Sequence, residues 1–252
     1  MLRMRNSADY HEWIQSEYLD EDWDAAAGRF LRSAALSDVL EYLRMLGITG
    51  GARVLDLGGG RGLLSHGLYK NGYHPTLLEI SMSAVTGLGS LAGSWEGFEP
   101  VCANAEEMPF RDGVFDVVVC KQVIHHSENL PRLLSEVFRI LRHGGAVIAY
   151  KEHCLPWYGG KHRFLKEHPS ARMGAQENAF RTITYHRAFR SCGFKKMTIV
   201  DIEPPERMRQ YYLQLPIRKT LLQVPLIGAL FFWVAYLSIM CGGIGAWSPV
   251  RP

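Results

Sequence analysis

A short apolar strand that runs into a glycine-rich turn constrains the fold of this chain more than any other feature. Residues 54–62 read VLDLGGGRG, with Asp56 just before the glycines, and a helix-like run begins at Gly62. Glycines let a backbone turn sharply and approach a ligand without side-chain clash. Because the first amides of a helix have no partner within it, we expect them to point at a bound ligand. The stretch therefore predicts a strand, a ligand-binding loop and a helix.

Strand-like and helix-like runs alternate over residues 36–202. The strand-like runs cover 53–57, 76–79, 100–102, 114–120, 146–151 and 196–202, and the helix-like runs cover 36–46, 62–69, 130–141 and 184–192. Repeated βα units imply a parallel sheet covered by helices. We therefore predict an α/β fold over residues 35–216: a Rossmann-like, mostly parallel sheet with helices on both faces. An acidic and aromatic lead-in at 1–34 predicts an N-terminal helical cap, either packed on the domain or acting as a lid.

Residues 151–181 interrupt the alternation. They contain Pro156, Gly159 and Gly160 together with several basic residues, and they follow a strand. In open α/β sheets, ligands bind outside the carboxyl ends of the strands. We therefore expect an insertion that roofs the substrate site, with an ordinary surface connection as the alternative.

The C-terminal segment, residues 217–252, differs in composition. Residues 224–241 carry no charge, and Arg218 and Lys219 precede them. Such a run approaches the length of about 20 residues that a membrane-spanning helix needs. We predict a hydrophobic helical segment that associates with a membrane, with contact through residues 221–247. A single span, an in-plane helix, a re-entrant hairpin and a helix buried against the domain or a second subunit remain open.

Composition and charge limit the partners. A net charge of only +3 gives no case for nucleic acid binding. The five cysteines include no CxxC pair, which argues against a disulfide framework or structural zinc site. The N-terminus lacks the apolar run of a secretory signal peptide. These features predict a cytoplasmic protein, associated with a membrane through its C-terminal segment.

The glycine loop and a later acid together favour a nucleoside-containing cofactor. A dinucleotide loop reads GxGxxG, but Leu63 occupies the last glycine position. Glu79 ends the next strand, where a carboxylate accepts hydrogen bonds from ribose hydroxyls. The loop therefore argues against an NAD-dependent oxidoreductase, although the acid that would bind a ribose is present.

Four motifs in order resemble the class I S-adenosylmethionine (SAM)-dependent methyltransferases, closest to the type 11 subgroup with the ubiquinone and menaquinone methyltransferases. The motifs are VLDLGGGRG, LLEIS, NAEEMPFRDGVFDVVVCKQVIHH and RLLSEVFRILRHGGAVIAYKEH. The resemblance covers residues 36–202 and implies an enzyme that uses SAM. It says almost nothing about the methyl acceptor. Residues 174–194 are also similar to methyltransferases of glycan or lipid-linked pathways.

The resemblance also implies cofactor contacts. The implied contacts are Asp56, Gly58, Gly59 and Gly60 at the methionine part, Glu79 at the ribose, Ile80 at the adenine, Asn104, Ala105 and Glu106 at the adenine edge, and Lys121 and Gln122 beside the sulfonium. Asn104 departs from the acidic residue that the family commonly has there, so it lacks a charge for the adenine amino group. For Asp56, bracing the loop or capping the helix is the alternative role.

Three histidines are candidates for the base that removes a proton from the acceptor. His125 and His126 follow the fourth predicted strand, and His153 follows the fifth. A histidine titrates near neutrality and can serve, although structural packing is the alternative. No metal-ligand spacing stands out, so no metal is predicted.

These observations predict methyl transfer from SAM to a lipid, quinone-like or lipid-linked glycan acceptor at a membrane surface. One alternative is a soluble small-molecule O-methyltransferase whose C-terminal segment forms a dimer interface. Another is a non-catalytic SAM-binding protein. The acceptor atom and the oligomeric state stay open.

Overall fold

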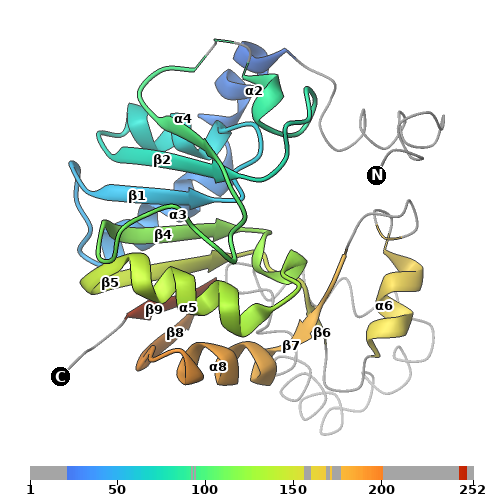
Figure 1. Ribbon diagram of the computed structural model, residues 1–252. Helices are drawn as coiled ribbons and strands as arrows, with labels where there is room; N and C mark the ends of the chain where they lie inside the picture. Colours follow the sequence, from blue (N-terminus) through green and yellow to red (C-terminus); the bar gives the residue numbers. More distant parts are fainter. Residues whose placement is uncertain are drawn as a thin grey trace, which may run out of the picture.

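A seven-stranded sheet forms the centre of the molecule (Figure 1). The computed structural model describes residues 22–91, 93, 95–155, 160–168, 171, 177–200 and 244–248. The strands are β1 (Arg53–Leu57), β2 (His74–Glu79), β3 (Glu99–Cys102), β4 (Phe115–Lys121), β5 (Leu141–Tyr150), β8 (Lys196–Val200) and β9 (Ile244–Ser248). Their order across the sheet is β3-β2-β1-β4-β5-β9-β8.

The first five strands are parallel, as predicted. The chain builds outward from β1 to β3 and then returns to place β4 on the other side of β1. The order therefore reverses between β1 and β4. In open α/β sheets a ligand crevice lies beyond the carboxyl ends of the strands at such a reversal.

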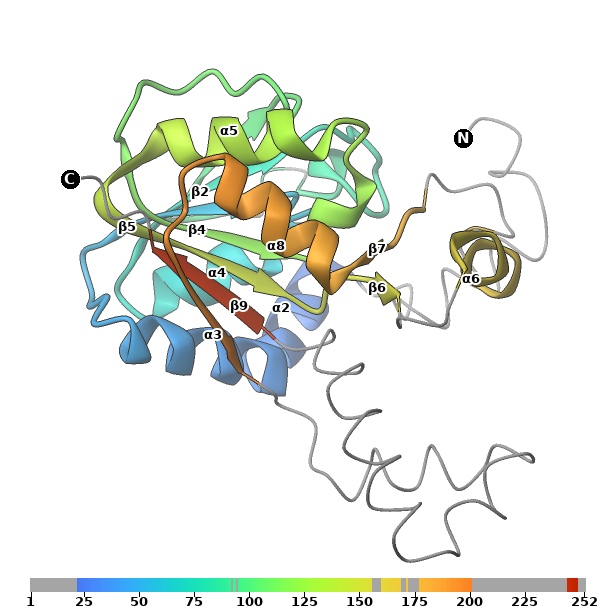
Figure 2. The ribbon, with the colours of Figure 1, turned by 90° about the horizontal axis from the view of Figure 1, so that it is seen from below.

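Helices cover both faces of the sheet, which confirms the predicted layers (Figure 2). The helices are α2 (Trp23–Phe30), α3 (Ala34–Met45), α4 (Leu63–Lys70), α5 (Leu130–Ile140), α6 (Lys161–Glu167) and α8 (Thr182–Ser191), with short 3-10 turns η1 (Leu88–Ser90) and η2 (Ile124–His126). Figure 2 shows α5 and α8 on one face and α3 and α4 on the other.

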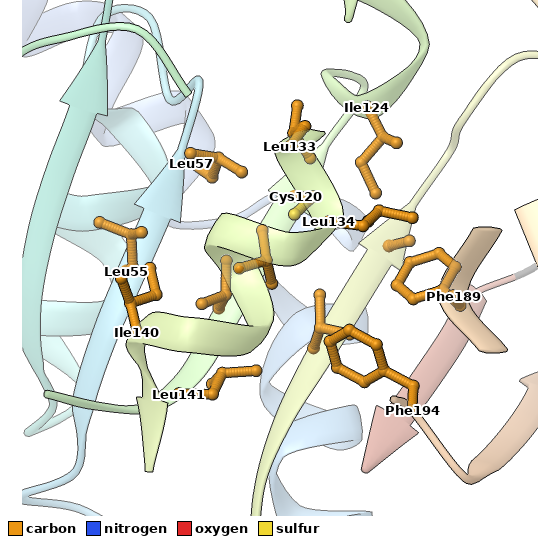
Figure 3. Packing of buried hydrophobic residues seen from close by; sticks show 14 of the residues in the cluster. Leu55, Leu57, Cys120, Ile124, Leu133, Leu134, Ile140, Leu141, Phe189 and Phe194 are labelled. Atoms are coloured by element: carbon orange, nitrogen blue, oxygen red, sulfur yellow. The ribbon is translucent and has the colours of Figure 1, made fainter. Parts of the chain in front are cut away.

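The strands divide their apolar side chains between two cores because successive residues of a strand point to opposite faces. Leu55 and Val118 pack beneath α5 and α8, whereas Val54 and Val117 pack beneath α3 and α4. Figure 3 shows the first core, in which side chains of α5 meet those of the sheet. Each fully buried leucine or valine contributes on the order of 1.5–3 kcal/mol.

Helix α5 shows why a segment of this sequence is helical. The Asn129 side chain accepts a hydrogen bond from the Arg132 amide at 3.1 Å and caps the helix. Apolar residues then recur at helical spacing and are buried; they are Leu130, Leu133, Leu134, Val137 and Ile140. The helix leads directly into β5, which places the end of β5 beside the end of β4.

Strand β9 corrects part of the prediction for the C-terminal segment. Residues 244–248 were expected in a membrane-associating stretch, but they lie between β5 and β8 and pair antiparallel with both. An uncharged run is as typical of an interior strand as of a lipid contact, so the sequence pattern did not separate the two. Residues 217–243 and 249–252 lie outside the described residues. None of the helices in the described part of the chain is long and apolar enough to cross a membrane.

The predicted cap and insertion both lie near the binding edge. Helix α2 packs on α4, and the Trp23 indole donates a hydrogen bond to the Arg61 carbonyl of the glycine loop at 2.8 Å. Residues 1–21 of the cap lie outside the described residues. Within the insertion, a parallel pair joins β6 (Cys154–Leu155) to β7 (Phe180–Arg181). With α6, this pair lies beyond the carboxyl ends of β4 and β5 (Figure 1).

Candidate functional site

The glycine loop joins the end of β1 to the start of α4. Gly58 has φ +66°, and a Cβ atom there would lie 2.2 Å from Cγ2 of Val123, so only glycine fits. The sequence predicted free amides, but the structure differs. The amides of Gly58, Gly60 and Gly62 donate to the Leu78 carbonyl, the Glu79 carboxylate and the Gly59 carbonyl. The loop is therefore held in shape largely by its own hydrogen bonds.

Glu79 is held at the end of β2 by two backbone amides. Its Oε2 accepts from the Gly60 amide at 3.0 Å, and its Oε1 accepts from the Ser81 amide at 2.8 Å. A carboxylate oxygen has a second lone pair, so each oxygen can still accept a hydroxyl. Ile80, the predicted adenine contact, follows directly and is 64% exposed. The carboxylate is thus pre-oriented beside an open apolar surface.

Asp56 lies beneath the glycine loop. It is fully buried, and its Oδ2 accepts from the Ser65 amide at 3.0 Å and the Ser65 hydroxyl at 2.8 Å. Burial raises the pKa of Asp56 to about 6, against the opposing effects of Ser65 and Lys121. A Cβ atom on Gly59 would lie 2.4 Å from Asp56 Oδ2, so this glycine lets the loop close over the carboxylate. The contacts favour the loop-bracing role; a contact with the methionine part of SAM stays a prediction.

The turn after β3 carries the predicted adenine-edge residues Asn104, Ala105 and Glu106. The Asn104 side chain is exposed and accepts from the Glu106 amide at 2.8 Å. The Glu106 carboxylate accepts from the Asn129 amide at 2.7 Å, which ties it to the start of α5. Both polar side chains therefore shape the turn, and their contacts with adenine stay predictions.

Lys121 is the last residue of β4 and Gln122 follows it, directly across the strand reversal from the glycine loop. Gln122 adopts φ +57°, which is strained for a residue other than glycine, and its amide donates to the Tyr150 carbonyl at 2.9 Å. Strain of this kind concentrates at functional sites. Burial lowers the pKa of Lys121, and the Asp56 carboxylate opposes that shift. These two residues thus lie where the sulfonium contact is predicted.

Strand register brings all of these residues to one edge. Leu57 pairs with Leu78 on one side and with Cys120 on the other, while Glu79 pairs with Cys102. The glycine loop, Glu79, the turn after β3 and the end of β4 therefore lie along one edge of the sheet, where a fold of this kind forms its ligand crevice. We call this edge the cofactor side, because the predicted SAM contacts lie here.

A cluster of histidine and glutamate side chains occupies the neighbouring ends of β4 and β5. We call His125, His126, Glu152, His153 and Glu177 the histidine–glutamate cluster. The three histidines are the residues that the sequence predicted as candidate bases, and the structure places all three in this cluster. Sequence reasoning missed Glu152 and Glu177. Glu152 is adjacent to His153 in a motif already noted, but no spacing signal marks Glu177.

Within this cluster, Glu152 fixes the orientation of His125. Glu152 accepts hydrogen bonds from the amides of Val123, Ile124 and His125 at 3.0–3.1 Å. It also lies 2.6 Å from Nδ1 of His125, which is 1% exposed. Burial lowers the pKa of His125, against the opposing effect of Glu152. A neutral His125 that donates from Nδ1 to Glu152 presents the lone pair of Nε2 on its other side.

Glu177 lies on that other side. Its Oε2 is 3.7 Å from His125 Nε2, 3.5 Å from His153 Nδ1 and 3.9 Å from His126 Nδ1. The rings of His125 and His153 stack with centroids 3.9 Å apart. His126 is 42% exposed, so it forms the open edge of the cluster. Imidazole and carboxylate groups therefore converge beside the predicted sulfonium position, and we call this part of the site the acceptor side because the predicted bases lie here.

Comparisons with known proteins agree with this geometry. Residues 55–149 match a family described as "Methyltransferase domain". A ubiquinone/menaquinone biosynthesis C-methyltransferase, UbiE, from Haemophilus ducreyi is 25% identical over 186 residues, which cover 60% of this chain and 70% of that protein.

Solved structures share the fold at lower identity. Phosphoethanolamine N-methyltransferase 2 from Haemonchus contortus, solved with SAM, superposes with a TM-score of 0.60 at 18% identity, covering 85% of this chain and 53% of that chain. The [4+2]-cyclase SpnF superposes with a TM-score of 0.54 at 18% identity, covering 88% and 85%. Fold, strand-end acid and family match together show that the chain carries a class I SAM-dependent methyltransferase domain and uses S-adenosyl-L-methionine as its cofactor.

Proposed function

We propose that this enzyme transfers the methyl group of SAM to a hydrophobic, quinone-like small molecule. SAM lies in the cofactor side of the crevice, with its ribose on Glu79 and its sulfonium near Lys121 and Gln122. The acceptor lies over η2 and beneath the insertion. The relative from Haemophilus ducreyi that is 25% identical to this chain is a ubiquinone/menaquinone biosynthesis C-methyltransferase, which supports an acceptor of this class.

The observation that carries the proposal is the histidine–glutamate cluster beside the end of β4. Methyl transfer needs the acceptor atom in line with the sulfonium and close to it, and positioning supplies much of the rate. A ring hydroxyl becomes a better donor of electrons when its proton is removed. His125, His126 and His153 lie on the side of the crevice from which that proton would leave.

The uncharged stretch at 224–241 supports an acceptor of lipid character at a membrane surface. A test must keep β9 in place, because a chain cut after Pro216 also loses that strand. We therefore compare the full chain with a variant in which residues 221–241 are replaced by a short glycine–serine linker. The proposal expects full activity of this variant on a short-chain quinol in solution and reduced activity on a long-chain quinol in vesicles.

The decisive experiment incubates the full chain with labelled SAM and quinols that lack one ring methyl. We expect label in the quinol, and we expect Glu79→Ala to weaken S-adenosylhomocysteine binding by about 10–100-fold, as loss of a charged hydrogen-bond acceptor implies. Glu99→Ala, at an exposed strand start, is the matched control and keeps both properties. Label in a phospholipid or glycan fraction, with none in the quinols, would overturn the acceptor class but not the methyltransferase assignment.

A further inference from the structure

Three potential metal ligands converge within the histidine–glutamate cluster. One possible ligand atom from each of His125, His153 and Glu177 lies within 4.8 Å of the other two. They come from three separate segments: η2, the short connection between β5 and β6, and the residues before β7. The carboxylate and His125 are almost completely buried, and His153 is 20% exposed.

The distances among these atoms do not fit direct hydrogen bonds. Glu177 Oε2 lies 3.5 Å from His153 Nδ1 and 3.7 Å from His125 Nε2. An N–H···O hydrogen bond spans about 2.7–3.2 Å. Ligands that each lie about 2.0–2.1 Å from a tetrahedral zinc ion are about 3.3–3.5 Å apart. The observed separations are close to those of ligands around one cation.

The surroundings of His125 fit the same interpretation. Its Nδ1 lies 2.6 Å from Glu152, which also accepts three backbone amides and is therefore fixed in place. A histidine that binds a metal through one ring nitrogen usually donates from the other to a carboxylate or carbonyl. Glu152 thus leaves Nε2 as the coordinating atom and directs it toward Glu177.

We propose that His125, His153 and Glu177 bind a divalent transition-metal ion, with zinc as the first candidate. Two histidines and one carboxylate with an open position match zinc and related first-row metals, whereas magnesium and calcium prefer sites made of oxygen ligands. His126, which is 42% exposed and lies 3.9 Å from Glu177, marks the side from which an ion could enter. This inference goes beyond the proposed function and does not depend on the identity of the methyl acceptor. With His125 and His153 as ligands, His126 is the histidine of this cluster that can still take the acceptor's proton.

The test titrates cobalt(II), a coloured substitute for zinc, into the tag-free full chain after treatment with a chelator. We expect one ion per chain, with the visible absorption of a low-coordinate site, and displacement by zinc. His153→Ala and Glu177→Gln should each weaken binding by at least about 10–100-fold, and Glu152→Gln should weaken it within the same range by freeing His125. His143→Ala, an exposed histidine at the start of β5, is the matched control and should leave binding unchanged.

The affinity of each variant for S-adenosylhomocysteine shows whether it is folded, because none of these residues lies on the cofactor side. A crystal of the unaltered chain soaked with zinc adds a measurement that needs no variant. Anomalous scattering at the three ligand atoms supports the proposal. Cobalt binding that His143→Ala removes as readily as His153→Ala, or an anomalous signal only at surface histidines, would overturn it.

Discussion

The cofactor side and the acceptor side of the crevice hold their polar groups by different means. On the cofactor side, Glu79 is held by amides of the short loops that follow β1 and β2, and Asp56 is held by Ser65 in the first turn of α4. On the acceptor side, Glu152 and Glu177 bring together rings from segments that are far apart in the chain. The first arrangement follows from one strand–loop–helix unit repeated in order, whereas the second depends on how the insertion folds over the sheet.

This difference indicates where reaction specificity arises. The structures that share this fold include a protein named as a [4+2]-cyclase as well as an N-methyltransferase, so the fold alone does not determine the reaction. We propose that the side chains of the acceptor side decide what is bound opposite the cofactor. Four predictions test whether the two sides are separable, beginning with the largest expected effect.

Replacing Gly58 with alanine should damage both sides at once, because this residue packs on Val123 at the strand reversal. The new Cβ combines a clash with a positive φ, and we expect a loss of about 4 kcal/mol in unfolding free energy, measured in urea. Gly144→Ala is the matched control: its φ is +76°, but nothing lies within 4 Å of a Cβ there. That variant should lose only about 1–2 kcal/mol. Equal losses in the two variants would show that the contact with Val123 is unimportant.

Replacing Glu152 with glutamine should damage the acceptor side alone. The new amide group faces N–H donors and leaves some of them unsatisfied, so we expect about 3 kcal/mol of destabilisation and a lower kcat. Affinity for S-adenosylhomocysteine, measured by calorimetry, should change less than about 3-fold, which is about 0.7 kcal/mol. Glu107→Gln, on the surface, is the control. A loss of cofactor affinity as large as the loss of kcat would mean that the two sides are not separable.

Asp56→Asn tests the cofactor side through pH. Burial raises the folded-state pKa to about 6 from an ordinary value of 3.8, so the folded chain keeps a proton that the unfolded chain releases. Stability should therefore fall by about 2 kcal/mol as the pH rises from about 4 to 7. The asparagine variant should lack this pH-dependent part of the unfolding free energy. Unfolding curves of the variant and of the unaltered chain, recorded at each pH, measure the difference. Parallel pH profiles of the two proteins would contradict the prediction.

Trp23→Phe tests the contact between helix α2 and the glycine loop, for which we expect the smallest effect. Loss of the indole hydrogen bond to the Arg61 carbonyl should cost about 1 kcal/mol of stability, measured by thermal unfolding. Cofactor affinity should fall slightly, with kcat on saturating SAM unchanged. Trp95→Phe, at an exposed tryptophan, is the control. No difference between the two variants would show that α2 only covers α4.

The site residues that could be predicted from the sequence were predictable for one physical reason. Glu79 and the glycine loop lie at the ends of consecutive strands, and the pattern of a parallel sheet brings such ends together without further information. Glu177 could not be assigned, because its position depends on the fold of the insertion, 24 residues beyond His153. Strand β9 was missed for a related reason: its partners β5 and β8 are distant in sequence, and five uncharged residues do not identify their neighbours.

The pairing of β8 with β9 has a consequence for any attachment of this enzyme to a bilayer. Val200 lies opposite Ile244 in an antiparallel ladder, so the two described residues that flank positions 201–243 are neighbours in the sheet. A single passage through a bilayer between these residues would put two hydrogen-bonded strands in different compartments. If an anchor were located between these residues, its two ends would have to lie on the same side of the bilayer, and the catalytic site would stay on that side.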